Sequence, residues 1–327
     1  MKRILYNICI SIISILLTLI IIEGGVRYYF SDHLNYDFEM WRYAAELKEP
    51  LGDTLLPFHH KANVFGKYYG VEINTNSLGL RDVEFKIPKP LGTKRVMMLG
   101  DSFTLGWGVP FSETLAKRLE KQIATKFSNY EILNMGTGNY NSSMEVELFK
   151  RKGLTLEPNI VVLMYYINDT EPTPKISSNT YPLMKHVYLP NYVNAKLTQL
   201  SMMEGASDWL QTYYRKLYSP DSEGFRKSKD ALKELIRLTA DKKIKLLIVN
   251  IPDLRRLDKY PFGFATALAK EAAEKSVLPF LDLLPFFENY DGKTLWVSKD
   301  DSHMNSHANS IAAEAIFEKM IKEKMLE

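Results

Sequence analysis

Beyond Lys94, short apolar runs alternate with longer amphipathic segments, and this alternation constrains the fold more than any other feature of the sequence. Short apolar runs that stop at turn residues are typical of buried strands, whereas apolar residues spaced three or four apart are typical of helices. The predicted strands are 95–99, 131–135, 160–166, 245–251 and 278–281, and the predicted helices are 112–127, 143–152, 225–241, 263–275 and 306–324. Strands separated by helices form parallel βαβ units. We therefore predict an α/β fold, a flavodoxin-like three-layer α/β/α sandwich with a parallel five-stranded sheet.

Residues 4–22 are uncharged and mostly apolar, and they predict one transmembrane helix ahead of this domain. A helix of this length nearly matches the roughly 30 Å hydrocarbon core of a bilayer. The run is longer than the roughly 7–15 apolar residues of a signal peptide, and no A-x-A-like cleavage site follows, so we expect an anchor that is retained. Lys2 and Arg3 precede it, which predicts a cytoplasmic N-terminus. The expected location is the inner membrane, single-pass, with a periplasmic catalytic domain.

The chain divides into three predicted parts. Residues 1–23 are the cytoplasmic N-terminus and transmembrane anchor, residues 24–90 are a juxtamembrane extension, and residues 91–327 are the α/β domain. Within the extension only residues 68–75 alternate regularly enough for a strand. Residues 171–223, rich in Pro, Tyr, Met and Asn, interrupt the domain as an insertion on the catalytic side. Its aromatic residues, such as Trp209, suit either a substrate-binding element or a small satellite core.

Composition excludes several classes of protein. The net charge is only +3 and no basic block is interleaved with aromatic residues, so we expect no nucleic-acid partner. Cys9 is the single cysteine, which excludes an intrachain disulfide.

His59 and His60 are adjacent, so they would point to opposite sides of an extended chain, and no further ligand cluster lies near. We interpret both as solvated histidines and expect no metal site.

Ser102 is the candidate nucleophile. It follows the first predicted strand in Gly100-Asp101-Ser102, at a strand-to-helix turn. Ligands of open parallel sheets bind at the carboxyl ends of the strands, and a helix N-terminus there favours developing negative charge. Taken alone, the same triplet is also a common helix cap.

Two other predicted strands end in unusual turns. The second strand runs into the turn 134–141, whose Gly and Asn residues can take a positive φ and leave backbone N–H groups exposed. After the third strand comes Asn168-Asp169. These turns should meet Ser102 at one edge of the sheet.

His303 is the candidate general base, in a predicted loop just before the last helix. Asp300 lies three residues before it, a spacing that reaches the same face of a single turn, so we predict that Asp300 orients the ring of His303. His303 would then take the proton of Ser102. A zinc pair of His303 and His307 is the competing interpretation. It lacks the Glu that such a helix motif needs after the first histidine, because Met304 stands there.

These motifs resemble the SGNH/GDSL hydrolase superfamily, in a bacterial, membrane-anchored branch. Gly100-Asp101-Ser102 matches the nucleophile block, Asn168-Asp169 matches the Asn-Asp block, and Asp300-x-x-His303 matches the acid and base block, in the family's order along the chain. The resemblance covers the chain from about Asn74 to the C-terminal helix. It implies a catalytic triad of Ser102, His303 and Asp300 that needs no cofactor.

The resemblance also implies an oxyanion hole. Its donors would be the N–H of Ser102, the N–H of either Gly138 or Asn139, and the side chain of Asn168. The family usually has a glycine at the position of Asn139, and Asn tolerates the conformation that glycine adopts there.

The expected function is hydrolysis of O-acyl esters, O-acetyl esters in the first place, on an extracytoplasmic carbohydrate. An O-acyltransferase of an envelope polysaccharide would use the same triad while excluding water from the acyl-enzyme. A non-catalytic envelope assembly protein that keeps the fold is the third hypothesis.

Overall fold

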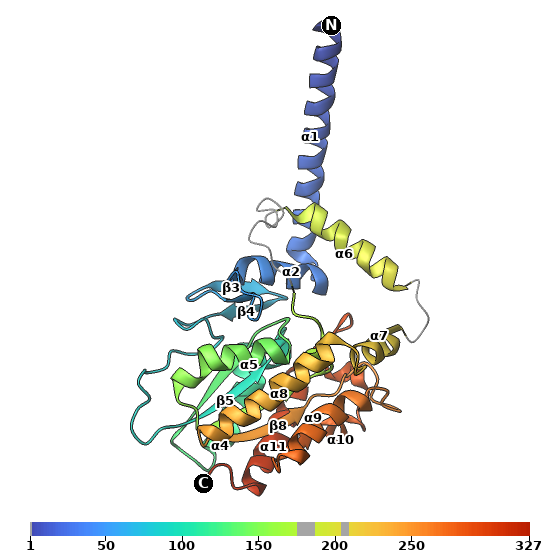
Figure 1. The fold of residues 1–327 in the computed structure, drawn as a ribbon. Coiled ribbons are helices and arrows are strands. Elements are labelled where there is room, and N and C mark those ends of the chain that lie inside the picture. The colour runs from blue at the N-terminus through green and yellow to red at the C-terminus, as the bar shows by residue number, and fades with distance from the viewer. Residues whose placement is uncertain (1, 175–186, 204–208) are drawn as a thin grey trace.

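A parallel five-stranded sheet forms the centre of the computed structural model, which describes residues 2–174, 187–203 and 209–327 (Figure 1). The strand order is β6-β5-β7-β8-β9, and every neighbouring pair is parallel. The strands are β5 (Lys94–Gly100), β6 (Tyr130–Gly136), β7 (Ile160–Tyr165), β8 (Lys245–Asn250) and β9 (Phe280–Asp282). The predicted α/β sandwich with a five-stranded parallel sheet is therefore confirmed.

Helices cover the sheet in two layers. One layer pairs α4 with α11, and the other packs α5 against α8 and α8 against α9. The helices are α3 (Ser102–Leu105), α4 (Leu115–Ala124), α5 (Ser142–Arg151), α8 (Glu223–Asp241), α9 (Gly263–Lys275), α10 (Leu284–Phe287) and α11 (Ser306–Lys322). Central strands lie between both layers, and for this reason β5 and β7 are buried along almost their whole length.

The predicted elements differ from the observed ones at two places that matter for the site. The predicted helix 112–127 begins later, at Leu115, because Thr114 caps it by accepting the N–H of Lys117. The segment before α11 is a hairpin of β10 (Trp296–Ser298) and β11 (Asp301–Met304), not the loop that we expected. His303 therefore lies on a strand.

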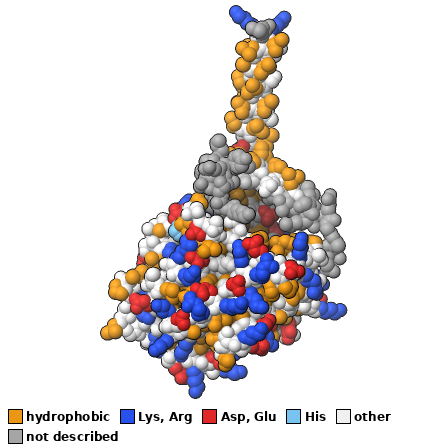
Figure 2. Space-filling view, in the orientation of Figure 1, with side chains coloured by type: hydrophobic (Ala, Val, Ile, Leu, Met, Phe, Trp, Pro, Cys, Tyr) orange, Lys and Arg blue, Asp and Glu red, His pale blue; other side chains and the backbone are white. Residues whose placement is uncertain are grey.

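The N-terminal helix α1 (Lys2–Asp32) projects away from the domain (Figure 1). An 18-residue window within its span Lys2–Phe30 has a mean hydropathy of 2.6, so this helix is long and apolar enough to cross a membrane. Figure 2 shows hydrophobic side chains along the visible face of α1, whereas the visible face of the domain mixes them with charged ones. The predicted run 4–22 lies within this helix.

The extension folds into small elements that lie against the domain. They are α2 (Tyr36–Leu47), the pair β1 (Lys48–Pro50) and β2 (Phe58–His60), and the hairpin β3 (Phe65–Tyr68) and β4 (Val71–Asn74). The predicted strand 68–75 is therefore only partly right: Tyr69 and Gly70, both with positive φ, form the turn of the hairpin. Buried aromatic rings of the extension form one apolar cluster with Leu105 and Trp107 of the domain.

The predicted insertion 171–223 is described only in part, since 175–186 and 204–208, including Tyr181 to Met184, lie outside the described residues. Its described helices are α6 (Tyr188–Met203) and α7 (Trp209–Leu217). Helix α6 contacts α1 and α2, and α7 contacts the turn that follows β7.

Candidate active site

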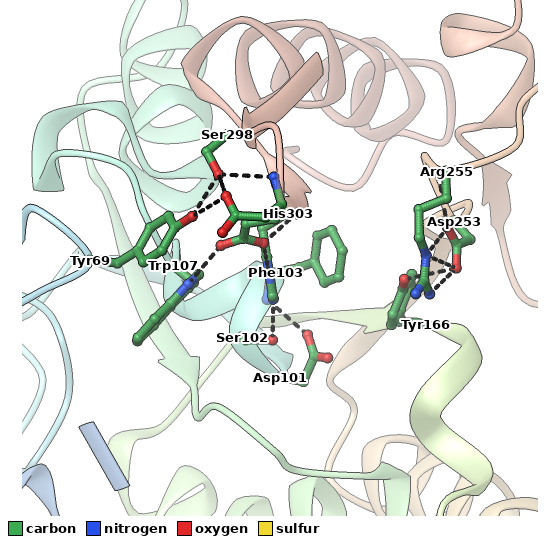
Figure 3. Close-up of polar contacts among 12 residues, drawn as sticks. Tyr69, Asp101, Ser102, Phe103, Trp107, Tyr166, Asp253, Arg255, Ser298 and His303 are labelled. Carbon is green, nitrogen blue, oxygen red and sulfur yellow. Dashed lines mark hydrogen bonds and ion pairs between the residues drawn. The ribbon is translucent and has the colours of Figure 1, made fainter. Parts of the chain in front are cut away.

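Ser102 lies at the turn between β5 and the single turn of helix α3 (Figure 3). Asp101 caps this turn, because its Oδ1 accepts the N–H of Phe103 at 2.9 Å. Gly100 permits the close approach of α3 and β7, since a Cβ there would lie 2.0 Å from Oγ1 of Thr104 and 3.1 Å from Cβ of Met164. The strand-to-helix placement predicted for Ser102 is thus observed.

His303 connects Ser102 to a buried carboxylate (Figure 3). Its Nε2 lies 2.8 Å from Oγ of Ser102, and its Nδ1 lies 2.5 Å from Oδ1 of Asp301. The other carboxylate oxygen of Asp301 accepts the indole N–H of Trp107 at 2.9 Å. This line of hydroxyl, imidazole and carboxylate is the geometry that activates a serine nucleophile.

Asp300 does not orient His303, and the sequence prediction was wrong on this point. Its Oδ1 instead accepts hydrogen bonds from the hydroxyls of Ser298 at 2.6 Å and Tyr69 at 3.2 Å. The prediction assumed a helical turn, in which residues three apart share a face. On β11 residues two apart share a face, so Asp301 and His303 point the same way.

The two alternatives for the second backbone donor are separated by their hydrogen bonds. The N–H of Gly138 donates to the hydroxyl of Tyr43 at 2.9 Å. Asn139 is exposed, has a φ of 66°, and lines the same pocket as Ser102. Of the two residues, Gly138 has its N–H engaged by Tyr43, and Asn139 is the one that lines the pocket of Ser102.

Asn168 and Asp169 have separate surroundings. The Nδ2 of Asn168 donates to Oδ2 of Asp101 at 2.8 Å, and the same residue lines the pocket beside Ser102. The carboxylate of Asp169 is buried and accepts the N–H of Tyr166 at 2.8 Å. Burial raises the pKa of Asp169 well above its usual value. Asp169 is thus a buried partner of the turn that holds Asn168.

One pocket of about 400 Å³ contains Ser102 and His303. It is lined by Tyr36, Ser102, Phe103, Asn139, Tyr166, Asn168, Glu171, Tyr214, Arg255, Trp296, Lys299, Asp300, Asp301, Ser302 and His303. Rings of Phe103 and Tyr36 lie 4.7 and 5.6 Å from the ring of His303.

Sequence reasoning missed several of these residues. Arg255 follows β8, so the rule that directed attention to the ends of the first three strands would also have found it. Its guanidinium pairs with the buried carboxylate of Asp253. Burial acts to lower the pKa of Arg255, but the charge of that carboxylate outweighs burial and raises this pKa above its usual value. Tyr36 lies in the extension, and no motif signals its place beside His303.

Three of the other histidines, His59, His60 and His307, have different environments. His60 is buried, not solvated as we expected: its ring lies 2.5 Å from the hydroxyl of Tyr43, and burial lowers its pKa to about 3. His59 is partly exposed and pairs with Glu49. His307 is exposed on α11. In the part of the chain that the structure describes, no three or more His, Cys, Asp or Glu side chains are grouped to hold a metal ion.

Comparison with known proteins identifies the family. Residues 98–311 match the model of the GDSL-like Lipase/Acylhydrolase family. No curated protein matches the sequence.

Similar solved structures share little sequence with the chain. TesA is 14% identical, over 69% of this chain and 98% of its own, with a TM-score of 0.46. The psychrotrophic esterase EstA from Pseudoalteromonas sp. is 14% identical, over 72% of this chain and 100% of its own, with a TM-score of 0.45. A two-domain esterase (CEX) active on acetylated mannans is 15% identical, over 71% of this chain and 49% of its own, with a TM-score of 0.42.

The matched region spans more than half of the chain and includes both Ser102 and His303. The resemblance that the sequence motifs indicated is thereby confirmed. The chain belongs to the GDSL-like lipase/acylhydrolase family and is a serine ester hydrolase.

Proposed function

We propose that this protein is a membrane-anchored serine esterase that removes O-acyl groups, O-acetyl groups in the first place, from an extracytoplasmic carbohydrate. The observation that carries the esterase part is the hydrogen-bonded line from Asp301 through His303 to Ser102. The observation that favours a carbohydrate is the composition of the pocket around that line.

In the proposed reaction, Oγ of Ser102 attacks the ester carbonyl while Nε2 of His303 takes its proton. Asp301 holds Nδ1–H of the ring and stabilises the imidazolium that forms. The oxyanion accepts hydrogen bonds from the N–H of Ser102, the N–H of Asn139 and Nδ2 of Asn168. Collapse of this intermediate expels the alcohol, which takes the proton from His303 and leaves an acyl group on Ser102.

Water completes the cycle. His303 takes a proton from a water molecule as its oxygen attacks the acyl carbon, and a second oxyanion intermediate forms in the same hole. Its collapse breaks the bond to Oγ of Ser102, which recovers the proton from His303. The products are the free carboxylic acid and the unchanged enzyme.

The lining of the pocket favours an ester whose alcohol part is a polar molecule such as a sugar over one with a long lipid chain. Its walls include the rings of Tyr36, Tyr214 and Trp296 together with the charged groups of Glu171 and Arg255. Aromatic faces cover the apolar faces of sugar rings, while charged groups hydrogen-bond to hydroxyls. Of the aromatic residues predicted for this role, Tyr214 lines the pocket. Trp209, 37% exposed, is not among the described residues that line it.

The tether directs the enzyme to envelope substrates. The basic residues Lys2 and Arg3 ahead of the apolar run favour a cytoplasmic N-terminus, with the catalytic domain in the periplasm. A fusion of alkaline phosphatase to the C-terminus should therefore be active. Activity of a cytoplasmic reporter at that end would reverse the proposed orientation.

Labelling with a fluorophosphonate tests the mechanism, because the probe reacts with activated serines. The full chain in detergent should take the label and hydrolyse p-nitrophenyl acetate, and Ser102→Ala should do neither. Release of free acetate equal to p-nitrophenol, unaffected by added glycans, supports the esterase. Acetate that appears on an added oligosaccharide would identify a transferase, and an unlabelled wild type would identify a non-catalytic protein.

Substitution of two neighbouring tyrosines on α7 tests whether the substrate is a carbohydrate. Tyr214 lines the pocket, whereas the ring of Tyr213 is 41% exposed. We expect Tyr214→Ala to raise KM for an acetylated oligosaccharide about tenfold, and to raise it less for p-nitrophenyl acetate. Tyr213→Ala, the matched control, should leave both values unchanged. Equal values of kcat/KM for long-chain and acetyl esters would argue against a carbohydrate substrate.

A further inference from the structure

A buried lysine of the extension contacts the turn that carries Asn139. Lys48, at the start of β1, is 7% exposed, and its ammonium donates to the carbonyl of Gly138 at 2.5 Å and to Oδ1 of Asn139 at 2.8 Å. The ring centroids of Tyr43 and Phe58 lie 4.6 and 4.3 Å from the same nitrogen. Among the residues that the structure describes, the partners of this ammonium are a carbonyl, an amide oxygen and two aromatic faces, and none of them is a carboxylate.

Burying an ammonium without a carboxylate beside it is unfavourable, and burial lowers the pKa of Lys48 well below its usual value. A methionine would fill similar space without that cost. The polar contacts of the ammonium are with the turn after β6, so its effect is on that turn.

Tyr43 holds the same turn from the other side of Gly138. Its hydroxyl accepts the N–H of Gly138 at 2.9 Å, and a Cβ at position 138 would lie 2.8 Å from Cε1 of its ring. The ring of Tyr43 thus packs directly on Gly138, and a larger residue at 138 would displace it.

His60 sets the direction of the hydrogen bond of Tyr43. Burial lowers the pKa of His60 to about 3, so its ring is neutral at physiological pH. Its Nδ1 lies 3.2 Å from the carbonyl of Gly79, which only accepts, so Nδ1 carries the proton and Nε2 is the acceptor. Nε2 then accepts the hydroxyl proton of Tyr43, which leaves the oxygen of Tyr43 to accept the N–H of Gly138.

The contacts of Lys48 with Gly138 and Asn139 restrict the direction of the N–H of Asn139. In a trans peptide the C=O and N–H groups point in opposite directions. Lys48 holds the carbonyl of Gly138, so the N–H of Asn139, in the same peptide unit, points away from Lys48, and Asn139 itself lines the pocket. The φ of 66° at Asn139 is one that residues other than glycine rarely adopt, and Lys48 also holds the side chain of this asparagine.

We propose that Lys48 and Tyr43 are positioning residues of the oxyanion hole. They hold the Gly138 peptide from the extension so that the N–H of Asn139 faces the oxygen that becomes negative when Ser102 attacks an ester. The active site is then incomplete without residues 43–48. This inference rests on the proposed function, since it assigns a support to the oxyanion hole of that same reaction.

Lys48→Met and Tyr43→Phe test the inference in the full chain. Loss of a well-placed oxyanion donor costs about 10²- to 10³-fold in kcat, and we expect a misdirected one to cost about 10- to 100-fold. KM for p-nitrophenyl acetate should change less than about twofold, because the contact acts in the transition state. Affinity for a boronic acid, which forms a tetrahedral anion on a serine, should fall by the same factor as kcat/KM.

Turnover is expressed per site titrated with fluorophosphonate, because a merely structural role would lower the number of active sites without lowering their rate. Lys152→Met is the matched control. Lys152 is partly buried, and its ammonium likewise donates to a backbone carbonyl, that of Leu78. Its kcat per titrated site should equal that of the wild type.

The outcomes separate the two proposals. A wild type that neither takes the label nor hydrolyses esters would overturn the proposed function and this inference together. A labelled wild type whose kcat and boronate affinity are unchanged in both variants would overturn this inference alone. If Lys48→Met fails to fold, Tyr43→Phe decides, because it keeps the ring that packs on Gly138.

Discussion

The α/β domain and the extension contribute to the site in different ways. The domain places Ser102, Asn139 and Asn168 directly after three neighbouring strands, where the parallel topology brings their loops together. The extension contributes Lys48 and Tyr43, which contact backbone and side-chain atoms of the turn that carries Asn139. These three pocket residues thus follow strands of the domain, whereas the two residues that contact that turn belong to short elements of the extension.

The two regions are also stabilised differently. One continuous apolar core surrounds the sheet of the domain and includes Leu56, Phe58 and Leu80 of the extension. The sheets of the extension have only two strands each, and such sheets are only marginally stable in isolation. The extension therefore depends on packing against the domain for its stability. Arg81 illustrates this dependence: its buried guanidinium donates to the carbonyls of Leu105, Gly106 and Val109 in the domain. The extension and the nucleophile turn are therefore one packing unit.

The largest effect should come from the reacting groups of the domain. We expect Ser102→Ala or His303→Ala to lower kcat by more than about 10⁴-fold while the melting temperature stays near that of the wild type. Because these residues act as a unit, the double variant should be little worse than either single one. His307→Ala is the control. Full esterase activity in Ser102→Ala would show that the chemistry lies elsewhere.

The next effect distinguishes the two neighbouring aspartates. Asp301→Asn should lower kcat about 10³-fold, because an amide at that place favours the wrong tautomer of His303. Asp300→Asn should lower it less than about threefold, since Asp300 bonds to Ser298 and to Tyr69 of the extension. Steady-state kinetics on p-nitrophenyl acetate measure both. A larger loss for Asp300→Asn would restore the sequence-based assignment.

In the extension, buried His60 should make the free energy of unfolding depend on pH. His60 has a pKa of about 3 in the folded chain and about 6.5 when unfolded, so the unfolded state binds the proton more readily. The stability from a neutral His60 is complete above pH 6.5 and is lost as the pH falls toward 3. Between pH 7.5 and 5 the free energy of unfolding should fall by about 2 kcal/mol from this group.

Urea unfolding at both pH values measures this loss. His60→Gln should lack that part of the pH dependence, whereas His59→Gln, the partly exposed control, should keep it. If His60→Gln shows the same slope as the wild type, His60 does not titrate as its burial indicates.

The smallest effect concerns Trp107, at the junction of the two regions. Its indole N–H donates to Oδ2 of Asp301, and its ring stacks with Tyr69 of the extension at 5.9 Å. Trp107→Phe removes the hydrogen bond, and we expect kcat per titrated site to fall about tenfold. Trp209→Phe, on the partly exposed α7, is the control. An unchanged rate would mean that His303 alone holds Asp301 in place.

The sequence by itself determined the order of strands and helices, the placement of Ser102 after β5 and that of Asn168 after β7. These features depend on local periodicity, on turn residues and on short motifs, all of which lie within one segment of the chain. The same locality explains the error at Asp300, because the spacing rule for a turn was applied to residues that lie on a strand.

Only the tertiary structure decided which aspartate holds His303, which of Gly138 and Asn139 has its N–H engaged, and that Tyr36 lies in the pocket. Each of these depends on a partner from a distant segment: Trp107 contacts Asp301, and Tyr43 contacts Gly138. A hydrogen bond between such residues leaves no periodicity in the sequence, since it forms only when packing has brought the two segments together.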